Sequence, residues 1–144
     1  MKKIAVIYWS GTGNTEMMAK AIAEGAATGD IEVTLLNVAN AKADDAFGAD
    51  AVALGCPSMG AEILEEDEME PFVASLDSAG IKDKPVVLFG SYDWGNGEWM
   101  KDWEERMKGY GAKLVEEGLI VNLTPDAAAL EDCKALGSKL ANSI

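Results

Sequence analysis

The sequence predicts an α/β fold: a single doubly wound, five-stranded parallel sheet with helices on both faces. Short apolar runs alternate with helix-length amphipathic segments along the whole chain, and several of these runs are apolar without interruption. Strict alternation is typical of a parallel sheet, and strands buried on both sides read as continuous apolar runs. Because there is no internal repeat and no linker, residues 1–144 are expected to form one domain.

The five expected strands differ in how apolar they are. In chain order they are residues 4–8, 31–37, 51–55, 85–90 and a fifth strand split around Gly118 into 113–115 and 119–121. The first, third and fourth are nearly all apolar, which predicts central positions in the sheet. The second mixes polar with apolar residues and is expected near an edge.

The helices are predicted from apolar residues at helical spacing and from residues that start a helix. The first begins at about Asn14, a short weak helix spans 43–48, and the helix within 65–76 is expected to begin at Pro71, because proline suits a first turn. The expected inward residues are Met18, Ala21, Ile22 and Gly25 in the first helix, Met100, Trp103, Met107 and Tyr110 in the fourth, and Leu130, Cys133, Leu136 and Leu140 in the last.

The composition excludes several classes of function. A formal charge of −13 argues against nucleic acid and anionic membranes as partners, and the absence of histidine removes the usual general base and metal ligand. No catalytic residue and no metal site are therefore expected, although carboxylates alone could still bind a hard cation. No apolar run approaches about 18 residues and no leader pattern is seen, so a cytoplasmic protein is expected. Cys56 and Cys133 are expected to be reduced thiols in the core.

A loop rich in glycine and hydroxyl groups joins the first strand to the first helix. It reads Ser10-Gly11-Thr12-Gly13-Asn14-Thr15. Unpaired amides at a helix start favour a bound anion. No lysine or arginine lies between Lys3 and Lys20, so hydrogen bonds alone would hold that anion, which favours a small phosphate monoester. The alternative is that these residues merely form a turn and a helix cap.

Two related phosphate-binding motifs do not fit this loop. The NTPase loop ends in Gly-Lys-Ser/Thr, whereas this chain has Gly13-Asn14-Thr15. The dinucleotide-binding fingerprint requires a third glycine or alanine where Glu16 stands. Right-handed crossovers place the loops after strands one, three and four at the carboxyl edge of the sheet, where a ligand is expected to bind.

Two more loops at that edge each carry a large side chain among small residues. They are residues 56–62, with Met59, and residues 91–97, with Trp94. A large apolar group on such a loop normally needs something to cover it. Together the two side chains suit the two faces of a planar ring. The alternative is that both pack on neighbouring helices.

Four segments at and around these loops form a specific combination. They are Tyr8-Trp9-Ser10-Gly11-Thr12-Gly13-Asn14-Thr15-Glu16, Gly55-Cys56-Pro57-Ser58-Met59-Gly60, Glu70-Pro71-Phe72, and Phe89-Gly90-Ser91-Tyr92-x-Trp94-Gly95-x-Gly97-x-Trp99-Met100. The chain thereby resembles, from end to end, the short-chain flavodoxins of clostridial and related anaerobic type. The resemblance implies a flavodoxin-like fold with strand order 2-1-3-4-5 and non-covalent FMN. It also implies a low-potential one-electron carrier that shuttles between semiquinone and hydroquinone.

The resemblance further implies which residues contact the cofactor. The loop after the first strand would hold the phosphate, Met59 and Trp94 would cover the two faces of the flavin, and Glu62 would accept a hydrogen bond from flavin N3. The complete expected set is Trp9, Ser10, Gly11, Thr12, Gly13, Asn14, Thr15, Pro57, Ser58, Met59, Gly60, Ala61, Glu62, Ser91, Tyr92, Asp93, Trp94 and Gly95.

A change in one peptide is also implied by the resemblance. The peptide joining Gly60 to Ala61 would turn over so that its carbonyl accepts a hydrogen bond from the proton added at flavin N5, and glycine makes the required positive φ accessible at little cost. Surrounding carboxylates would then oppose the negative charge that a second electron adds to the flavin. This chain departs from the family at Ala61, where relatives often have Asp or Ser, and at Asp93, where they typically have Gly.

Other functions stay open on the sequence alone. A flavin-dependent reductase on the same fold, or an FMN-binding module without a redox role, would share these motifs. A receiver domain needs acidic residues where Trp9 and Ser10 stand, and a low-molecular-weight phosphatase needs arginine in the loop after Cys56. An electron carrier rather than an enzyme is the expectation.

The acidic segments 65–70 and 98–105 suggest what such a carrier would bind. Their charge predicts basic-faced redox partners, reductases and low-potential acceptors, that bind less tightly as salt is added. Solvated surface is the alternative for both segments. The chain itself is expected to be monomeric, with no membrane and no nucleic acid as partner.

Overall fold

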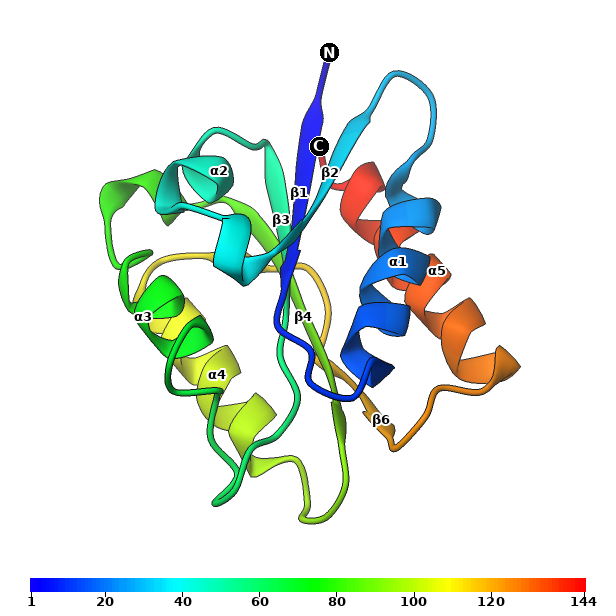
Figure 1. The fold of residues 1–144 in the computed structure, drawn as a ribbon. Helices are drawn as coiled ribbons and strands as arrows, with labels where there is room; N and C mark the ends of the chain where they lie inside the picture. Colours follow the sequence, from blue (N-terminus) through cyan, green and yellow to red (C-terminus); the bar gives the residue numbers. More distant parts are fainter.

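The computed structural model describes all residues, 1–144, and shows one sheet between two layers of helices (Figure 1). The strands are β1 (Lys3–Tyr8), β2 (Glu32–Asn37), β3 (Ala51–Gly55), β4 (Pro85–Tyr92), β5 (Lys113–Leu114) and β6 (Leu119–Asn122). The α-helices are α1 (Asn14–Ala26), α2 (Ala43–Phe47), α3 (Met69–Ala74), α4 (Glu98–Gly109) and α5 (Ala127–Asn142), and two 3-10 helices are η1 (Val38–Asn40) and η2 (Ala79–Ile81).

Every strand pair in the sheet is parallel, and the strand order is β2-β1-β3-β4-β5, with β6 also paired to β4. β5 pairs with the start of β4 and β6 with its end, so the two are halves of one interrupted strand. Helices α1 and α5 cover one face of the sheet, and α2, α3 and α4 cover the other (Figure 1). The predicted fold class, strand order and split fifth strand are therefore confirmed.

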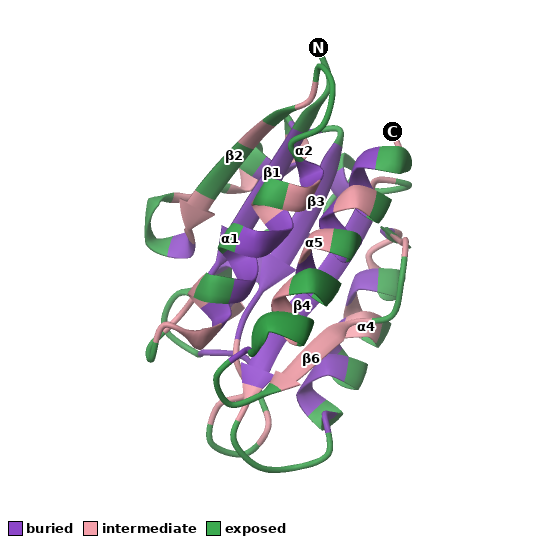
Figure 2. Ribbon diagram, turned by 90° about the vertical axis from the view of Figure 1, so that its right-hand side faces the viewer, coloured by how far each residue is buried: buried purple, intermediate pink, exposed green.

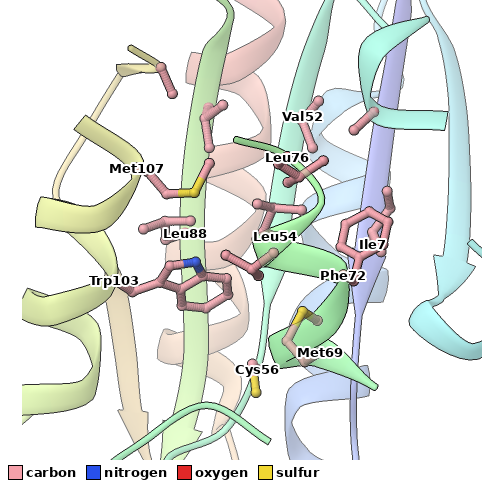
Figure 3. Packing of buried hydrophobic residues seen from close by; sticks show 14 of the residues in the cluster. Ile7, Val52, Leu54, Cys56, Met69, Phe72, Leu76, Leu88, Trp103 and Met107 are labelled. Carbon is pink, nitrogen blue, oxygen red and sulfur yellow. The ribbon is translucent and has the colours of Figure 1, made fainter. Parts of the chain in front are cut away.

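The burial of each strand follows its place in the sheet. Every residue of β3 is buried, whereas β2, at the edge, has none that is fully buried (Figure 2). The apolar cluster beneath α3 and α4 includes Leu54, Leu88, Trp103 and Met107 (Figure 3). A second cluster lies beneath α1 and α5. None of the helices is both long and apolar enough to cross a membrane.

Each apolar cluster contains one of the two cysteines. Cys56 lies in the cluster beneath α3 and α4, Cys133 in the other, and both are free and buried, as expected. Burial raises the pKa of Cys56 to about 12 and that of Cys133 to about 11. Because the thiolate is the reactive form, both thiols are inert packing residues.

The helix expected to begin at Pro71 begins instead at Met69, so that prediction was wrong by two residues. Pro71 still lies in the first turn, where its missing N–H interrupts no helical bond. The buried carboxylate of Glu65 accepts the amides of Asp67, Glu68 and Met69 at 2.7, 2.8 and 2.9 Å. Burial acts to raise the pKa of Glu65, but these three bonds lower it below the ordinary value. A side-chain acceptor upstream thus moves the helix start.

Helices α1 and α5 approach each other closely at two glycines. A Cβ built on Gly137 would lie 2.1 Å from the carbonyl oxygen of Ile22, and one on Gly25 would lie 2.0 Å from that of Lys134. Both obstructions are backbone atoms, so no side-chain rearrangement relieves them. This close approach seats α1, and with it the loop that opens α1, against the sheet.

We expect Gly137→Ala to destabilise the protein by about 2 kcal/mol, because two packed helices must separate to admit one methyl group. Gly109→Ala is the matched control: Gly109 ends α4 without a positive φ, and a Cβ there meets no atom within 4 Å. Alanine at that position is expected to stabilise the protein by up to about 1 kcal/mol. Urea unfolding followed by tryptophan fluorescence measures both changes, and equal effects would contradict the helix-packing argument.

Candidate cofactor site

The loops after β1, β3, β4 and β6 meet at the carboxyl edge of the sheet, at the lower end of Figure 1, while both termini lie at the opposite end. Between these loops lies a groove of about 270 Å³. Its lining residues are Trp9, Gly11, Thr12, Asn14, Pro57, Ser58, Met59, Ser91, Tyr92, Asp93 and Leu123. All of them except Leu123 belong to the set expected from the sequence.

The loop after β1 keeps several backbone amides free for an anion. Gly13, with a φ of 95°, caps α1, and Ser10 Oγ accepts the amides of Gly13 and Glu16 at 3.1 and 3.2 Å. In this loop the amides of Ser10, Gly11, Thr12, Asn14 and Thr15 donate to no atom of the chain, and the last four lie at the start of α1. Because they open a helix, the helix dipole adds to their attraction for negative charge. The Ser10 hydroxyl therefore stabilises the shape of the loop, and the neighbouring amides are the groups available to bind an anion.

Thr15 points its side chain into the protein instead of into the groove. Thr15 and Ser91 are only 1% and 5% exposed, and their hydroxyl oxygens lie 3.1 Å apart. Thr15 Oγ1 also accepts the amide of Ser91 at 3.3 Å. The structure thus brings only the amide of Thr15 to the expected phosphate position, while its hydroxyl ties the first turn of α1 to β4.

Trp9 stands beside the free amides and closes that side of the groove. A Cβ on Gly11 would lie 3.0 Å from the Trp9 ring, so this glycine is what lets the indole lie over the loop. The indole Nε1 donates to Glu68 Oε1 at 3.2 Å. Trp9 is thereby held between the loop after β1 and the acidic segment that precedes α3.

The loop after β3 forms a narrow turn around a peptide without hydrogen bonds. The amide of Met59 donates to the carbonyl of Ile63 at 2.9 Å, and the reverse bond measures 3.1 Å. Inside this frame Gly60 and Glu62 have positive φ, 36° and 57°. Neither the carbonyl of Gly60 nor the amide of Ala61 is bonded within the chain. That peptide is therefore free to turn without breaking a hydrogen bond.

Glu62 joins this turn to the loop after β4. Its Oε1 accepts the amides of Asn96, Gly97 and Glu98 at 3.0, 3.2 and 3.4 Å, at the start of α4. A Cβ on Gly95 would lie 2.2 Å from Oε1, so glycine is required there for the carboxylate to approach. Glu62, which is expected to accept a hydrogen bond from a ring N–H, thus also caps α4. It uses only one of its two carboxylate oxygens to do so.

The loop after β4 presents unpaired amides and an exposed indole. The amides of Asp93, Trp94 and Gly95 donate to no atom of the chain. The Trp94 side chain is 60% exposed and does not line the groove, so the structure does not place it over the ring position expected from the sequence. The exposed indole is available for contact with a ligand or a partner.

No lysine or arginine lines the groove, and Asp93 is its one charged residue. The only arginine of the chain, Arg106, forms two bonds of 2.7 and 2.6 Å with Glu70. These bonds hold the pKa of Glu70 below its ordinary value. An anion in the groove would therefore be held by dipoles and hydrogen bonds, without a compensating positive charge.

Leu123 is the lining residue that sequence reasoning missed. It belongs to no glycine-rich motif and follows β6 directly, and its amide donates to the carbonyl of Tyr92 at 2.8 Å. The available signal was topological: a split fifth strand that pairs with the end of β4 brings its own C-terminal turn to the same edge.

Glu62→Ala is expected to release the amides at the start of α4. Hydrogen bonds to a charged acceptor contribute about 1.5 to 3 kcal/mol each, so hydrogen exchange of residues 96–98 should accelerate at least about tenfold. Glu66→Ala, an exposed carboxylate in the neighbouring segment, is the control and should leave this exchange unchanged. Exchange followed by mass spectrometry tests this, and unaltered protection in Glu62→Ala would show that another contact holds the loop.

Comparisons with known proteins agree with this geometry. The flavodoxin family model matches residues 6–137. The flavodoxin of Clostridium beijerinckii is 50% identical over 137 residues, which cover 95% of this chain and 98% of that protein. The flavodoxin of Megasphaera elsdenii is 41% identical over 140 residues, covering 97% and 99%.

Solved structures give the same result. The two-electron reduced flavodoxin of Megasphaera elsdenii has a TM-score of 0.86 at 42% identity, with 96% of this chain and 98% of that chain covered. A flavodoxin from the domain Archaea has a TM-score of 0.90 at 30% identity, with 98% and 97% covered. The chain therefore belongs to the flavodoxin family, whose members bind FMN and transfer electrons rather than catalyse a reaction on a substrate of their own.

Proposed function

We propose that residues 1–144 work as one FMN-binding domain, and that the groove at the carboxyl edge makes this domain a low-potential one-electron carrier. One observation carries the proposal: unpaired amides at the start of α1 open directly into a groove walled by Trp9, Met59 and Tyr92. The amides suit a phosphate without a cation, and the apolar wall suits a planar ring. FMN has both parts, and when bound it supplies the ring that accepts and releases single electrons.

The proposed contacts follow from which groups are free. At the phosphate end they are the amides of residues 11, 12, 14 and 15, joined by the side chains of Thr12 and Asn14 in the groove. At the ring end they are the side chain of Met59 and the free amides of residues 93–95. Trp94 is proposed to cover the outer face of the ring, and Glu62 to accept from flavin N3 through its second oxygen.

The peptide joining Gly60 to Ala61 is the part of the site that we propose moves. It makes no hydrogen bond within the chain, and the paired Met59 and Ile63 hold the turn on either side of it. Turning this peptide would let the carbonyl of Gly60 accept a hydrogen bond from an N–H group at flavin N5. Glycine permits this at little cost, whereas Ala61 resists positive φ at its own position.

The proposed partners are redox proteins with basic faces. The acidic segment 65–70 contacts the groove wall through Glu68, which accepts from Trp9 Nε1, and the acidic segment 98–105 begins at Glu98, whose amide donates to Glu62. Two apolar side chains on the loops after β3 and β4 are exposed, Ile63 at 42% and Trp94 at 60%. A monomer is proposed, because a charge of −13 opposes self-association. A cytoplasmic location is proposed because both cysteines are free, as is typical of a reducing compartment.

Stepwise dithionite reduction of the FMN-loaded protein tests the function. An electron carrier should show a long-wavelength absorption band at intermediate reduction, and it should not oxidise NADH or reduce quinone on its own. A reductase would turn these substrates over and accumulate no such band. A protein that stays colourless and does not quench added FMN fluorescence would contradict the whole proposal.

A pair of glycine variants tests the phosphate end of the site, with binding measured by the quenching of FMN or riboflavin fluorescence. Gly13 and Gly29 both have positive φ, 95° and 57°, and a Cβ on either meets no atom within 4 Å, but only Gly13 lies in the expected phosphate loop. Gly13→Ala should weaken FMN binding while leaving riboflavin, which lacks the phosphate, unaffected. Gly29→Ala should change neither affinity.

Asp93→Gly is expected to raise the potential of the second one-electron reduction, because it removes a negative charge that lines the groove. One charge at about 10 Å corresponds to about 0.4 to 1.7 kcal/mol, or about 20 to 70 mV. Asp93→Asn should also raise this potential. Because asparagine removes the charge without the backbone freedom of glycine, this variant separates the two effects. Asp30→Asn, in the turn after α1 at the opposite end of the sheet, is the control. A redox titration in which Asp93→Gly leaves the potential unchanged or lowers it would count against this role.

A further inference from the structure

Leu123 combines two features that are unfavourable for a leucine. Its φ is 58°, in the left-handed region that residues with a Cβ avoid, and its side chain is 50% exposed. Only two other non-glycine residues have a positive φ, Glu62 and Asp83, and both are polar. Backbone outliers persist where the surrounding structure fixes them, and they gather at functional sites.

The turn that contains Leu123 is fixed to the end of β4. The amide of Leu123 donates to the carbonyl of Tyr92 at 2.8 Å. Asn122 Nδ2 donates to the carbonyls of Tyr92 and Asp93 at 3.2 and 3.4 Å, and Asn122 pairs with Tyr92 in the sheet. The left-handed leucine is therefore held beside the loop whose amides we assign to the ring end of the cofactor.

The side chain of Leu123 forms part of the groove wall. The apolar lining consists of Trp9, Met59, Tyr92 and Leu123, and the first three come from the loops after β1, β3 and β4. Leu123 adds a fourth wall from a separate segment, next to Asp93.

Resting on the proposed FMN site, we propose that Leu123 covers the bound flavin beside Asp93 and keeps water from that part of the ring. Excluding water there lowers the local dielectric constant, which strengthens the repulsion between Asp93 and charge added to the ring. Leu123 thus contributes to the affinity for FMN through apolar contact with the ring. By shielding the ring from water beside Asp93, it also makes the second one-electron reduction less favourable.

Two substitutions separate the side chain from the backbone. Asparagine tolerates the left-handed region, so Leu123→Asn keeps the turn and removes the apolar wall. Its FMN dissociation constant is expected to rise about five- to tenfold, which corresponds to the loss of part of a leucine's burial. Riboflavin should lose the same factor, because the contact is with the ring. Leu123→Met, which restores an apolar side chain, should bind FMN within about twofold of the unmodified protein.

Asp83→Asn is the matched control, since Asp83 also has positive φ, 62°, but lies at the opposite end of β4. We expect urea unfolding of the apoprotein to show no loss of stability in Leu123→Asn or Asp83→Asn, and FMN binding to change only in the former. Unchanged FMN affinity in Leu123→Asn, an equal loss in Leu123→Met, or a loss confined to FMN and absent with riboflavin would each overturn the proposal. Failure of the unmodified protein to bind FMN at all would instead overturn the proposed function.

Discussion

The proposed site depends on one electrostatic constraint: an anion is to be held by hydrogen bonds and dipoles, without a cation. At the start of α1 four amides lack an acceptor in the protein, and no lysine or arginine lines the groove. A cation would bind phosphate more simply, but it would also stabilise negative charge on a neighbouring ring. The attraction of the helix dipole for negative charge falls off within one turn of the helix. A phosphate bound at the start of α1 would therefore not bring positive potential to the ring, and negative charge on the ring would not be stabilised. A low reduction potential and an uncompensated phosphate site are therefore two results of the same choice of residues.

Such a site requires loops that stay in place without a ligand, and side-chain acceptors from distant segments provide this. Glu62 fixes the turn after β3 to the start of α4, and Thr15 and Ser91 fix α1 to the end of β4. Asn122 fixes the turn after β6 to the same place. These contacts join segments on different sides of the groove, while the amides of the loops after β1 and β4 remain unpaired.

The sequence predicted what depends on local pattern and missed what depends on contacts between segments. Apolar runs gave the strands, including the split fifth strand, and the glycine-rich loops gave nearly all of the groove lining. The missed features depend on individual side-chain contacts and on strand pairing, which no motif encodes. Glu65 moves the start of α3, and the hydroxyl of Thr15 turns inward to Ser91. Leu123 escaped notice because its place in the groove follows from strand pairing and from no recognisable motif.

The acidic residues near the groove serve both folding and redox chemistry, and this limits how they can change. Glu62 and Glu65 satisfy six backbone amides between them, which only an acceptor at those positions can do. Replacing either one by a neutral residue to ease reduction of the cofactor would also loosen a helix start. Asp93, by contrast, is exposed, and its side chain is not needed to hold the loop, because the bonds there come from Asn122 to backbone carbonyls. Variation in potential without loss of structure is therefore expected at exposed positions such as Asp93.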